Sequence, residues 1–474
     1  MSFPDLNPVT DDFVAKLRVD LPPKTFGELS PRYVEEIRKR YTGIGGVLLK
    51  PALTAEVAAI VAACGREKIG IVPYGGGTGL VAGQLMPEGP DPVILSLERM
   101  NNLRAVHPAE NVLIVEAGMV LADVQAAADA AGRLFALSLA SEGTCQIGGN
   151  LSTNAGGVSV LRFGNTRDLC LGLEAVLPDG SIWHGLKRLR KDNTGYDLRN
   201  LLIGAEGSLG IITAAALKMM PKPDEYHTAY LSVRSPQAAL DLLTEAQVQL
   251  AGSVSAFELI DRRGLEFLTE KLPQVRLPMP LGPPWMVLLD LGSMMADGMA
   301  ARLERFLVRA TEKELVDDGL IAQNQTQRRE FWAVRETIPE ANRLIGAVYS
   351  HDISVPVGDI PAFIEQGEAL AKRFPDLRLN CFGHLGDGNL HYNFFPPKGR
   401  KREEYDDIRE DIKDAVYQLV SSFGGSISAE HGIGRMKIAD LDTYGDPVKI
   451  ATMRAIKAAL DPSGIMNPGA VVKR

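Results

Sequence analysis

The stretch Pro73-Tyr-Gly-Gly-Gly-Thr-Gly79 decides how the first half of this chain is interpreted, because four of its seven residues are glycine. It follows the short apolar run 69–73, which predicts a strand. Glycine tolerates positive φ and the close approach of another group, so such a loop can turn successive backbone N–H groups toward one anion. A mobile glycine loop is the alternative for this stretch taken alone.

Two nucleotide-binding motifs do not fit this stretch. A P-loop ends in Gly-Lys-Ser or Gly-Lys-Thr, and residues 73–79 contain no lysine. Gly77, Gly79 and Ala82 match the relaxed spacing of a Rossmann turn, but that turn must open directly into a helix. The glycines and prolines at 83–92 disfavour a helix there. An anion-binding loop of another kind is therefore the better interpretation.

Two more stretches rich in glycine and small residues follow, at 142–157 and 202–213. Three such loops among alternating strands and helices favour a large phosphorylated cofactor. The strands are expected at 47–50 and 112–116, and the helices are expected at 55–68 and 121–131, with Thr54 as the N-cap of the first helix and Gly132 ending the second.

The length of the chain predicts more than one domain. Its 474 residues exceed the roughly 250–300 that a single core usually organises. Pro221-Lys-Pro223 is typical of a linker, and longer helices are expected beyond it at 236–250 and 299–314. We expect an α+β protein with a cofactor domain over 1–222, a substrate domain over 223–425, and a C-terminal segment over 426–474 that returns to the cofactor.

Composition excludes several classes of function. The net charge of −8 argues against a nucleic-acid partner, and no run of about 18 apolar residues predicts a membrane span. The four cysteines lack Cys-x-x-Cys spacing, so neither a disulfide scaffold nor a thiolate zinc site is expected. Free cysteines suit a reducing cytosol, and residues 1–8 lack the pattern of a signal peptide. We therefore expect a cytoplasmic protein.

The second half carries a candidate metal site. Folding residues 380–394 about Asp387-Gly388 would place His384 opposite His391 on one face, with Cβ atoms about 4.5–5.5 Å apart. Glu430-His431, in the glycine-rich segment 426–434, could supply a third ligand and a base. Two histidines and one carboxylate leave positions on a divalent metal open for a substrate. Partly buried structural histidines of a sheet are the alternative.

From about residue 40 to Gly469 the chain resembles the FAD-binding oxidoreductases of the vanillyl-alcohol-oxidase (PCMH) type. Within that family it is similar to the branch of D-lactate, glycolate and D-2-hydroxyglutarate dehydrogenases. Six motifs in the same order carry the resemblance: Pro73-Tyr-Gly-Gly-Gly-Thr-Gly79, Gly148-Gly-Asn-Leu-Ser-Thr-Asn-Ala-Gly-Gly157, Gly204-Ala-Glu-Gly-Ser-Leu-Gly-Ile-Ile-Thr213, Gly383-His-Leu-Gly-Asp-Gly-Asn-Leu-His391, Ser428-Ala-Glu-His-Gly-Ile-Gly434 and Asn467-Pro-Gly469.

The resemblance implies a two-part FAD-binding domain, an α+β cap domain for the substrate, and a C-terminal segment that returns to the flavin. No histidine stands in the loop Gly75–Gly79, where some relatives attach flavin covalently, so noncovalent FAD is expected. The implied cofactor-binding residues are Pro73, Gly75, Gly76, Gly77, Thr78, Gly79, Gln84, Glu142, Gly143, Gly148, Gly149, Asn150, Ser152, Thr153, Asn154, Gly156, Gly157, Glu206, Gly210, Ile211, Ile212 and Asn467.

The resemblance also implies the catalytic residues. In the metal-dependent members, the positions matching His384, His391 and Glu430 bind the metal, and the position matching His431 is the catalytic base. The position matching Arg335 binds the substrate carboxylate, although a salt-bridged helix residue is the alternative for this arginine on its own. Zinc is the expected metal, with manganese, cobalt or iron as alternatives.

The implied activity is the oxidation of a D-2-hydroxy acid to the 2-oxo acid by hydride transfer to FAD. We expect an electron-acceptor protein or a quinone as partner, and a homodimer. Ser350 departs from the family pattern, because many relatives carry there a lysine that would hold a second carboxylate. Lactate-like and other 2-hydroxy acids are therefore open. The alternatives are a metal-independent flavoprotein of the same fold, a metal hydrolase, and a non-catalytic electron-transfer or assembly subunit.

Overall fold

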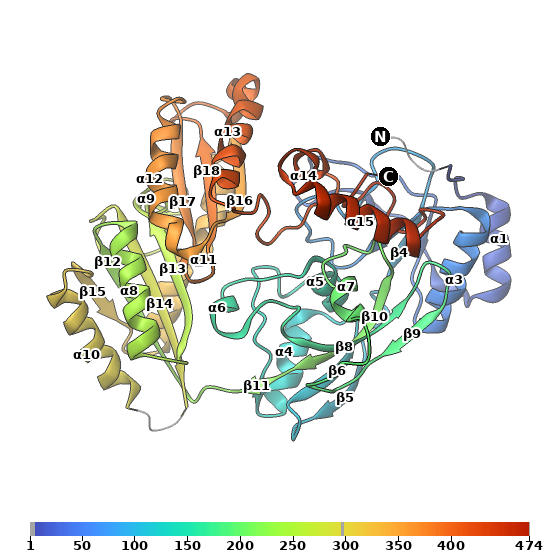
Figure 1. The fold of residues 1–474 in the computed structure, drawn as a ribbon, viewed down its shortest axis with the longest axis horizontal. Coiled ribbons are helices and arrows are strands. Elements are labelled where there is room, and N and C mark those ends of the chain that lie inside the picture. Colours follow the sequence, from blue (N-terminus) through green and yellow to red (C-terminus); the bar gives the residue numbers. More distant parts are fainter. Residues whose placement is uncertain (1–4, 295–297, 474) are drawn as a thin grey trace. The chain divides into compact units, whose positions relative to one another are not determined.

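The computed structural model describes residues 5–294 and 298–473, which form two compact units (Figure 1). Unit 1 comprises Met1–Gly157, Gly164–Lys222 and Glu430–Arg474, and unit 2 comprises Val158–Phe163 and Pro223–Ala429. The change of unit after Lys222 falls within the linker expected at 221–223. The second change of unit lies at 429/430, a few residues beyond the expected 425/426.

The segment Val158–Phe163, expected in the first domain, belongs to unit 2 instead. The reason is Arg162, at the end of the short helix α6 (Val160–Phe163). Its guanidinium donates to the backbone carbonyl of Gly292 at 2.8 Å and to the hydroxyl of Ser255 at 2.9 Å. A half-buried arginine whose hydrogen bonds end on two strands of unit 2 fixes the segment there. No local sequence pattern shows these long-range partners.

Unit 1 contains two main sheets. The first has the order β1-β2-β4-β3, in which β2 and β3 both run parallel to β4, and the second is an antiparallel sheet with the order β5-β6-β10-β8-β9. The strands of the first are β1 (Phe26–Gly27), β2 (Val47–Leu49), β3 (Ile71–Tyr74) and β4 (Val93–Ser96); those of the second are β5 (Leu103–His107), β6 (Val112–Glu116), β8 (Cys170–Val176), β9 (Ile182–Gly185) and β10 (Ile211–Lys218). A separate pair joins β7 (Arg133–Leu134) to β11 (Met220–Pro221).

The helices of unit 1 are α1 (Asp11–Asp20), α2 (Pro31–Val34), α3 (Thr54–Glu67), α4 (Leu121–Ala130), α5 (Ile147–Thr153), α7 (Leu198–Leu202), α14 (Ile438–Tyr444) and α15 (Pro447–Leu460). The two helices expected in unit 1, at 55–68 and 121–131, form as α3 and α4, but the N-cap of the first differs. The N-cap of α3 is Leu53 rather than Thr54. The hydroxyl of Thr54 instead donates to Glu174 Oε1 on β8 at 2.6 Å, a tertiary contact that competes with capping.

The C-terminal segment completes unit 1 beside β3. The backbone N–H of Asn467 donates to the carbonyl of Ile71, and Met466 forms a β-bridge to the same residue. Lys457 of α15 donates its ammonium to Asp461 and to the carbonyls of Ser208 and Met466. A buried charge needs such partners, so this lysine anchors the segment to the cofactor domain.

Unit 2 is built on one seven-stranded sheet with the order β15-β12-β14-β13-β17-β18-β16, in which all neighbouring pairs are antiparallel (Figure 1). Its strands are β12 (Glu225–Val233), β13 (Val254–Asp261), β14 (Trp285–Ser293), β15 (Asp318–Ile321), β16 (Tyr349–Ser354), β17 (Arg378–His384) and β18 (Asn389–Phe395). Its longer helices are α8 (Pro236–Gln249), α9 (Arg262–Lys271), α10 (Met299–Glu312), α11 (Gln325–Ile345), α12 (Ile360–Ala371) and α13 (Arg409–Ser422).

Helices cover both faces of this sheet. On one face, α9 and α11 pack against Ile260, Leu288 and Phe382 in a single apolar cluster with Trp332 and Ile338. On the other face, Phe363 of α12 packs edge-on against Tyr392 of β18. Burial on both faces makes the strands apolar almost throughout, so polar side chains on the α11 face stand out as candidates for function.

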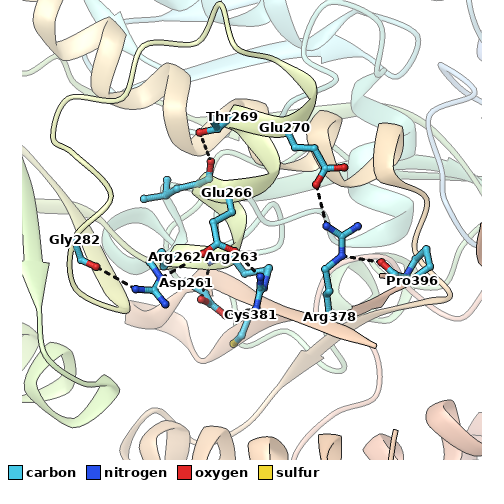
Figure 2. Close-up of polar contacts among 11 residues, drawn as sticks. Asp261, Arg262, Arg263, Glu266, Thr269, Glu270, Gly282, Arg378, Cys381 and Pro396 are labelled. Atoms are coloured by element: carbon cyan, nitrogen blue, oxygen red, sulfur yellow. Dashed lines mark hydrogen bonds and ion pairs between the residues drawn. The ribbon is translucent and has the colours of Figure 1, made fainter. Parts of the chain in front are cut away.

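Figure 2 shows the start of α9, where a buried aspartate caps the helix. Asp261 accepts the backbone N–H of Arg263 at 2.9 Å and that of Cys381 at 3.5 Å. Burial raises the pKa of Asp261 to about 6, against the smaller opposing effect of these hydrogen bonds. A raised pKa in the folded state means that stability is lost as pH rises through about 6.

We therefore expect Asp261→Asn to stabilise unit 2 at pH 8, because asparagine keeps a capping oxygen and removes the buried charge. The difference in the free energy of unfolding between Asp261→Asn and wild type should shrink by about 2 kcal/mol as pH falls from 7 to 4. Urea unfolding at both pH values measures it. Asp446→Asn, at the exposed N-cap of α15, is the matched control. An advantage that does not change with pH would contradict the buried-charge explanation.

Candidate functional site

The glycine loop after β3 is held in a conformation that larger residues cannot adopt. A Cβ on Gly76 would lie 2.2 Å from the carbonyl oxygen of Thr144. Gly77 has φ +73°, and its Cβ would lie 2.2 Å from the hydroxyl of Tyr74. The backbone at both positions is therefore packed against neighbours on one side and open on the other, as an anion-binding loop requires.

This loop forms one wall of a cavity of about 450 Å³ within unit 1. Most of the residues expected to bind FAD line this cavity. They are Pro73, Gly75, Gly76, Gly77, Thr78, Gly79, Gln84, Gly148, Gly149, Asn150, Ser152, Thr153, Gly156, Glu206, Gly210, Ile211 and Ile212. The three glycine-rich stretches thus come together, although residues 80–201 separate the first from the third along the chain.

Five expected cofactor residues lie outside the lining. Gly143 is exposed, and Glu142 is half-buried and accepts a hydrogen bond from Gln125. Asn154 ends α5 with φ +51° and accepts the N–H of Arg167. Gly157 and Asn467 make the contacts to the C-terminal segment described below. A glycine-rich motif specifies loop conformation as well as ligand contact, so not every residue of these motifs faces the cavity.

Two buried amide side chains of the lining fit a cofactor with hydrogen-bonding groups. Gln146 Oε1 and Asn150 Oδ1 are buried and have no hydrogen-bond partner among residues 5–294 and 298–473. An unpartnered buried acceptor is costly, which indicates that a bound group satisfies it. Sequence reasoning missed Gln146 and the apolar lining residues Leu97, Ala117 and Leu139. Gln146 is the N-cap of α5. Its position within the second glycine-rich stretch, 142–157, was the signal that the sequence offered.

We expect Gly76→Ala to weaken FAD binding without unfolding the protein. The added methyl would overlap a backbone carbonyl that cannot rotate away, and such overpacking costs about 1–3 kcal/mol. That corresponds to roughly 5–150-fold in the dissociation constant of FAD. Flavin fluorescence titration of the stripped protein measures it. Gly65→Ala in α3, where the new Cβ meets only ordinary contacts at 3.7 Å, is the control that should bind FAD normally.

The turn that carries Glu430 and His431 is fixed by Glu206. The buried carboxylate of Glu206 accepts the backbone N–H of Ile433 at 2.8 Å and that of Gly434 at 2.9 Å. Burial raises the pKa of Glu206, and the backbone hydrogen bonds oppose that shift. Glu206 therefore lines the cavity as expected, while its carboxylate holds the C-terminal segment.

Arg435, in the same turn as Ile433 and Gly434, also fixes the C-terminal segment within unit 1. Its guanidinium donates to the carbonyl of Gly83 at 2.8 Å and to Asn467 Oδ1 at 2.7 Å. The amide of Asn467 in turn donates to the carbonyls of Gly83 and Glu206. Burial lowers the pKa of Arg435 to about 10. The side chain of Asn467 therefore acts behind the cavity, between the glycine loop and the C-terminal segment.

Glu430 and His431 both line the cavity, beside the glycine loops. Glu430 Oε1 accepts the backbone N–H of Gly157 at 2.9 Å, which ties it to the second glycine-rich stretch. His431 is half-buried on the same wall. A carboxylate and an imidazole therefore face the space that the glycine-rich stretches enclose.

In unit 2 the expected hairpin forms, but with a different register. β17 and β18 pair so that His384 lies opposite Asn389 and Phe382 lies opposite His391. The chain reverses through a single helical turn over Leu385–Asp387, and Gly388, with φ +86°, completes it. The predicted two-residue turn at Asp387-Gly388 is therefore wrong, because this four-residue connection shifts the pairing.

The shift leaves the two histidines on one face of the sheet. A displacement by two residues preserves the side on which a strand residue points. The imidazole rings of His384 and His391 have their centroids 5.9 Å apart. Zn–N bonds of about 2.0–2.1 Å place two imidazoles on one tetrahedral zinc at roughly 5 Å between centroids, so the pair fits a shared metal. Both belong to unit 2 and Glu430 belongs to unit 1, so the complete ligand set stays a prediction.

Glu258 on β13 is a further residue of this face, and sequence reasoning missed it. It is 1% exposed, and its two oxygens bind two of the predicted residues. Oε1 lies 2.7 Å from His384 Nδ1, and Oε2 accepts Arg335 Nε–H at 2.8 Å. Burial acts to raise the pKa of Glu258, but the neighbouring charges of His384 and Arg335 outweigh it and hold that pKa below its ordinary value. Arg335 is therefore buried and salt-bridged, and its guanidinium stacks over Phe382 at 4.9 Å.

Comparison with known proteins finds two protein families that match successive parts of this chain. The family of FAD binding domains matches residues 46–185, and the family of FAD linked oxidases, C-terminal domain, matches residues 222–471. The mitochondrial D-2-hydroxyglutarate dehydrogenase of Arabidopsis thaliana is 39% identical over 90% of this chain and 75% of its own length. That of Bos taurus is 36% identical over 97% and 83%, and a D-2-hydroxyglutarate–pyruvate transhydrogenase of Saccharomyces cerevisiae is 33% identical over 91% and 87%.

Solved structures show the same fold. An alkyldihydroxyacetonephosphate synthase matches 98% of this chain and 85% of its own, with a TM-score of 0.73 and 16% identity. A p-cresol methylhydroxylase matches 98% of both chains with the same TM-score and identity. These likenesses confirm the expected α+β fold class, a two-part FAD-binding domain with a cap domain.

The comparisons overturn the expected cytoplasmic location. The relatives from Arabidopsis thaliana, Bos taurus and Danio rerio are all named as mitochondrial proteins. The four buried free cysteines indicate a reducing compartment, and the cytosol is only one such compartment. Among the helices in the described part of the chain, none is long and apolar enough to cross a membrane.

Proposed function

Because this chain belongs to the FAD-linked oxidase family, together with the D-2-hydroxyglutarate dehydrogenases, we propose that it oxidises a D-2-hydroxy acid to the 2-oxo acid with the help of a divalent metal. The resemblance read from the six sequence motifs is confirmed, and the chain is an FAD-linked oxidoreductase. The metal hydrolase considered from sequence loses its support, since a hydrolase needs no flavin.

The proposal rests chiefly on Glu430 and His431, which line the cavity enclosed by the FAD-binding loops. A bound FAD supplies the hydride acceptor, and it is expected to be noncovalent. His431 is the proposed base for the proton of the substrate hydroxyl, a role worth roughly 10²–10⁴-fold in rate. The turn that carries His431 is held by hydrogen bonds from the backbone N–H groups of Ile433 and Gly434 to Glu206.

The metal is the second part of the proposal. His384 and His391 would hold it from unit 2 and Glu430 from unit 1, with zinc as the first choice and manganese, cobalt or iron as alternatives. A metal there supplies a Lewis acid that lowers the pKa of the substrate hydroxyl. Arg335 is the proposed partner of the substrate carboxylate, because its guanidinium is rigidly held and permanently charged.

The substrate is proposed to be a D-2-hydroxy acid of the lactate or 2-hydroxyglutarate kind. Names of relatives support both, since one relative from Schizosaccharomyces pombe is called a putative D-lactate dehydrogenase. Ser350, exposed on β16 opposite Asn393, has no charge to offer a second carboxylate, which favours a monocarboxylate. An electron-acceptor protein or a quinone is the proposed oxidant of the reduced flavin, and a homodimer is the proposed assembly.

Anaerobic flavin bleaching tests this function. The purified yellow protein is mixed with D- and L-enantiomers of lactate, 2-hydroxyglutarate and longer 2-hydroxy acids, with and without chelator. Rapid bleaching by one D-acid, lost on chelation, is the expected result. Bleaching that survives exhaustive chelation would favour a metal-independent flavoprotein. A yellow protein that no hydroxy acid bleaches would favour an electron-transfer or assembly subunit.

A further inference from the structure

One carboxylate on the central strand β13 links the two residues of unit 2 that serve different parts of the proposed reaction. Glu258 directs Oε1 to the imidazole of His384 and Oε2 to the guanidinium of Arg335, at 2.7 and 2.8 Å. His384 comes from β17, in register opposite Glu258, and Arg335 comes from α11, which covers this face. All three side chains are buried.

The hydrogen bonds assign a role to one nitrogen on each partner. An ionised carboxylate only accepts hydrogen bonds, so Nδ1 of His384 donates its proton to Glu258. On Arg335 the Nε–H is used, and the two terminal Nη groups remain as a planar fork. Phe382 lies beneath this guanidinium at 4.9 Å and beside the ring of His391 at 4.8 Å, which limits rotation of both side chains.

A purely structural ion pair is a weak explanation for this arrangement. A buried ion pair adds little to stability compared with apolar residues of similar volume. The same face of the sheet carries a pair that fits a structural role, in which Arg378 binds Glu270 at 2.9 Å (Figure 2). The guanidinium of Arg378 also stacks over Phe267. That pair is more exposed, and among residues 5–294 and 298–473 its hydrogen bonds and ion pairs involve no histidine. Glu258 differs because one of its two oxygens binds His384, a predicted metal ligand.

We propose that Glu258 is a positioning residue that orients His384 for the metal and Arg335 for the substrate carboxylate at the same time. The inference rests on the proposed function. Through its two oxygens, Glu258 determines which nitrogen of His384 donates a proton and which edge of Arg335 faces away from the carboxylate. Loss of Glu258 should therefore change two measurable affinities, whereas loss of an ordinary ion pair should change neither.

The experiment compares Glu258→Gln with Glu270→Gln in full-length holoprotein. Glutamine offers one acceptor oxygen, so one of the two partners loses its hydrogen bond. Titration of chelator-stripped protein with Co²⁺, followed by its visible absorption, is expected to show 10–100-fold weaker binding in Glu258→Gln. The KM for the bleaching hydroxy acid should rise by a similar factor. FAD content should not change, and Glu270→Gln should match wild type in all three.

A double variant guards against misfolding, because Glu258→Gln leaves the guanidinium of Arg335 buried without a carboxylate. Glu258→Gln combined with Arg335→Gln leaves no unpaired charge, and Co²⁺ binding should still be weakened because His384 has lost its ionised partner. Unchanged Co²⁺ affinity in both variants, beside a wild type that binds Co²⁺, would overturn this inference and leave the proposed function standing. A wild type that binds no Co²⁺ would instead overturn the metal in the proposed function, and with it the role of Glu258 toward His384.

Discussion

Replacing His431 with alanine is expected to lower the rate of flavin reduction by roughly 10²–10⁴-fold while FAD remains bound. The imidazole lines the cavity enclosed by the glycine loops, where it can accept the hydroxyl proton of a substrate. Its removal should leave the cavity intact, because the turn is held through the backbone N–H groups of Ile433 and Gly434. Stopped-flow bleaching with saturating hydroxy acid measures the rate, and the visible spectrum measures bound FAD.

The control for this variant is His184→Ala. His184 lies on β9 in the same unit, and its side chain is 75% exposed. It should retain the wild-type rate. If His431→Ala bleaches at near wild-type speed, another group takes the proton and the assignment of the base is wrong. If it loses FAD as well, the imidazole contributes to cofactor binding.

Removal of the divalent metal is expected to reduce substrate-driven bleaching by at least 10²-fold, with recovery on adding Zn²⁺ back. Without the metal, the hydroxyl proton must leave a group of much higher pKa, so hydride transfer from the neighbouring carbon slows. The effect should be specific to chemistry, since none of the proposed ligands His384, His391 and Glu430 belongs to the three glycine-rich stretches that enclose the cavity. The flavin spectrum should therefore stay constant through chelation.

The variant His391→Ala tests the same site within the chain. It should show the low rate of the chelated protein, and added Zn²⁺ should fail to restore it. His227→Ala, on β12 of the same sheet, is the matched control and should respond to chelation and Zn²⁺ like wild type. Restoration of His391→Ala by ordinary Zn²⁺ concentrations would show that the metal is held by other residues.

Much of the candidate site could be predicted because its signals are local. A glycine loop that requires positive φ at Gly77 and leaves no room for a Cβ at Gly76 is written into consecutive residues. The alternation of strands and helices in the first half likewise depends on neighbours in sequence. The order of the family motifs along the chain adds to these local signals, and the fold class and the FAD-linked chemistry follow from both.

The misplaced hairpin register shows where local reasoning ends. Asp387-Gly388 is a strong signal for a two-residue turn, yet Gly388 ends a longer turn. The carbonyl of Gly388 accepts the N–H of Val355 on a neighbouring segment. Tertiary contacts selected the turn, and the pairing moved by two residues. The shared face of His384 and His391 survived because strand side chains repeat every two residues.

The sequence by itself determined the glycine-rich loops, the FAD-linked family and the residues that are proposed for the chemistry. Only the tertiary structure decided which groups hold those residues in place. Glu258 reaches His384 across 126 residues of sequence, and Glu206 reaches Ile433 across 227. Hydrogen bonds between distant segments leave no periodic trace in the sequence, because their geometry arises only when sheets and helices pack.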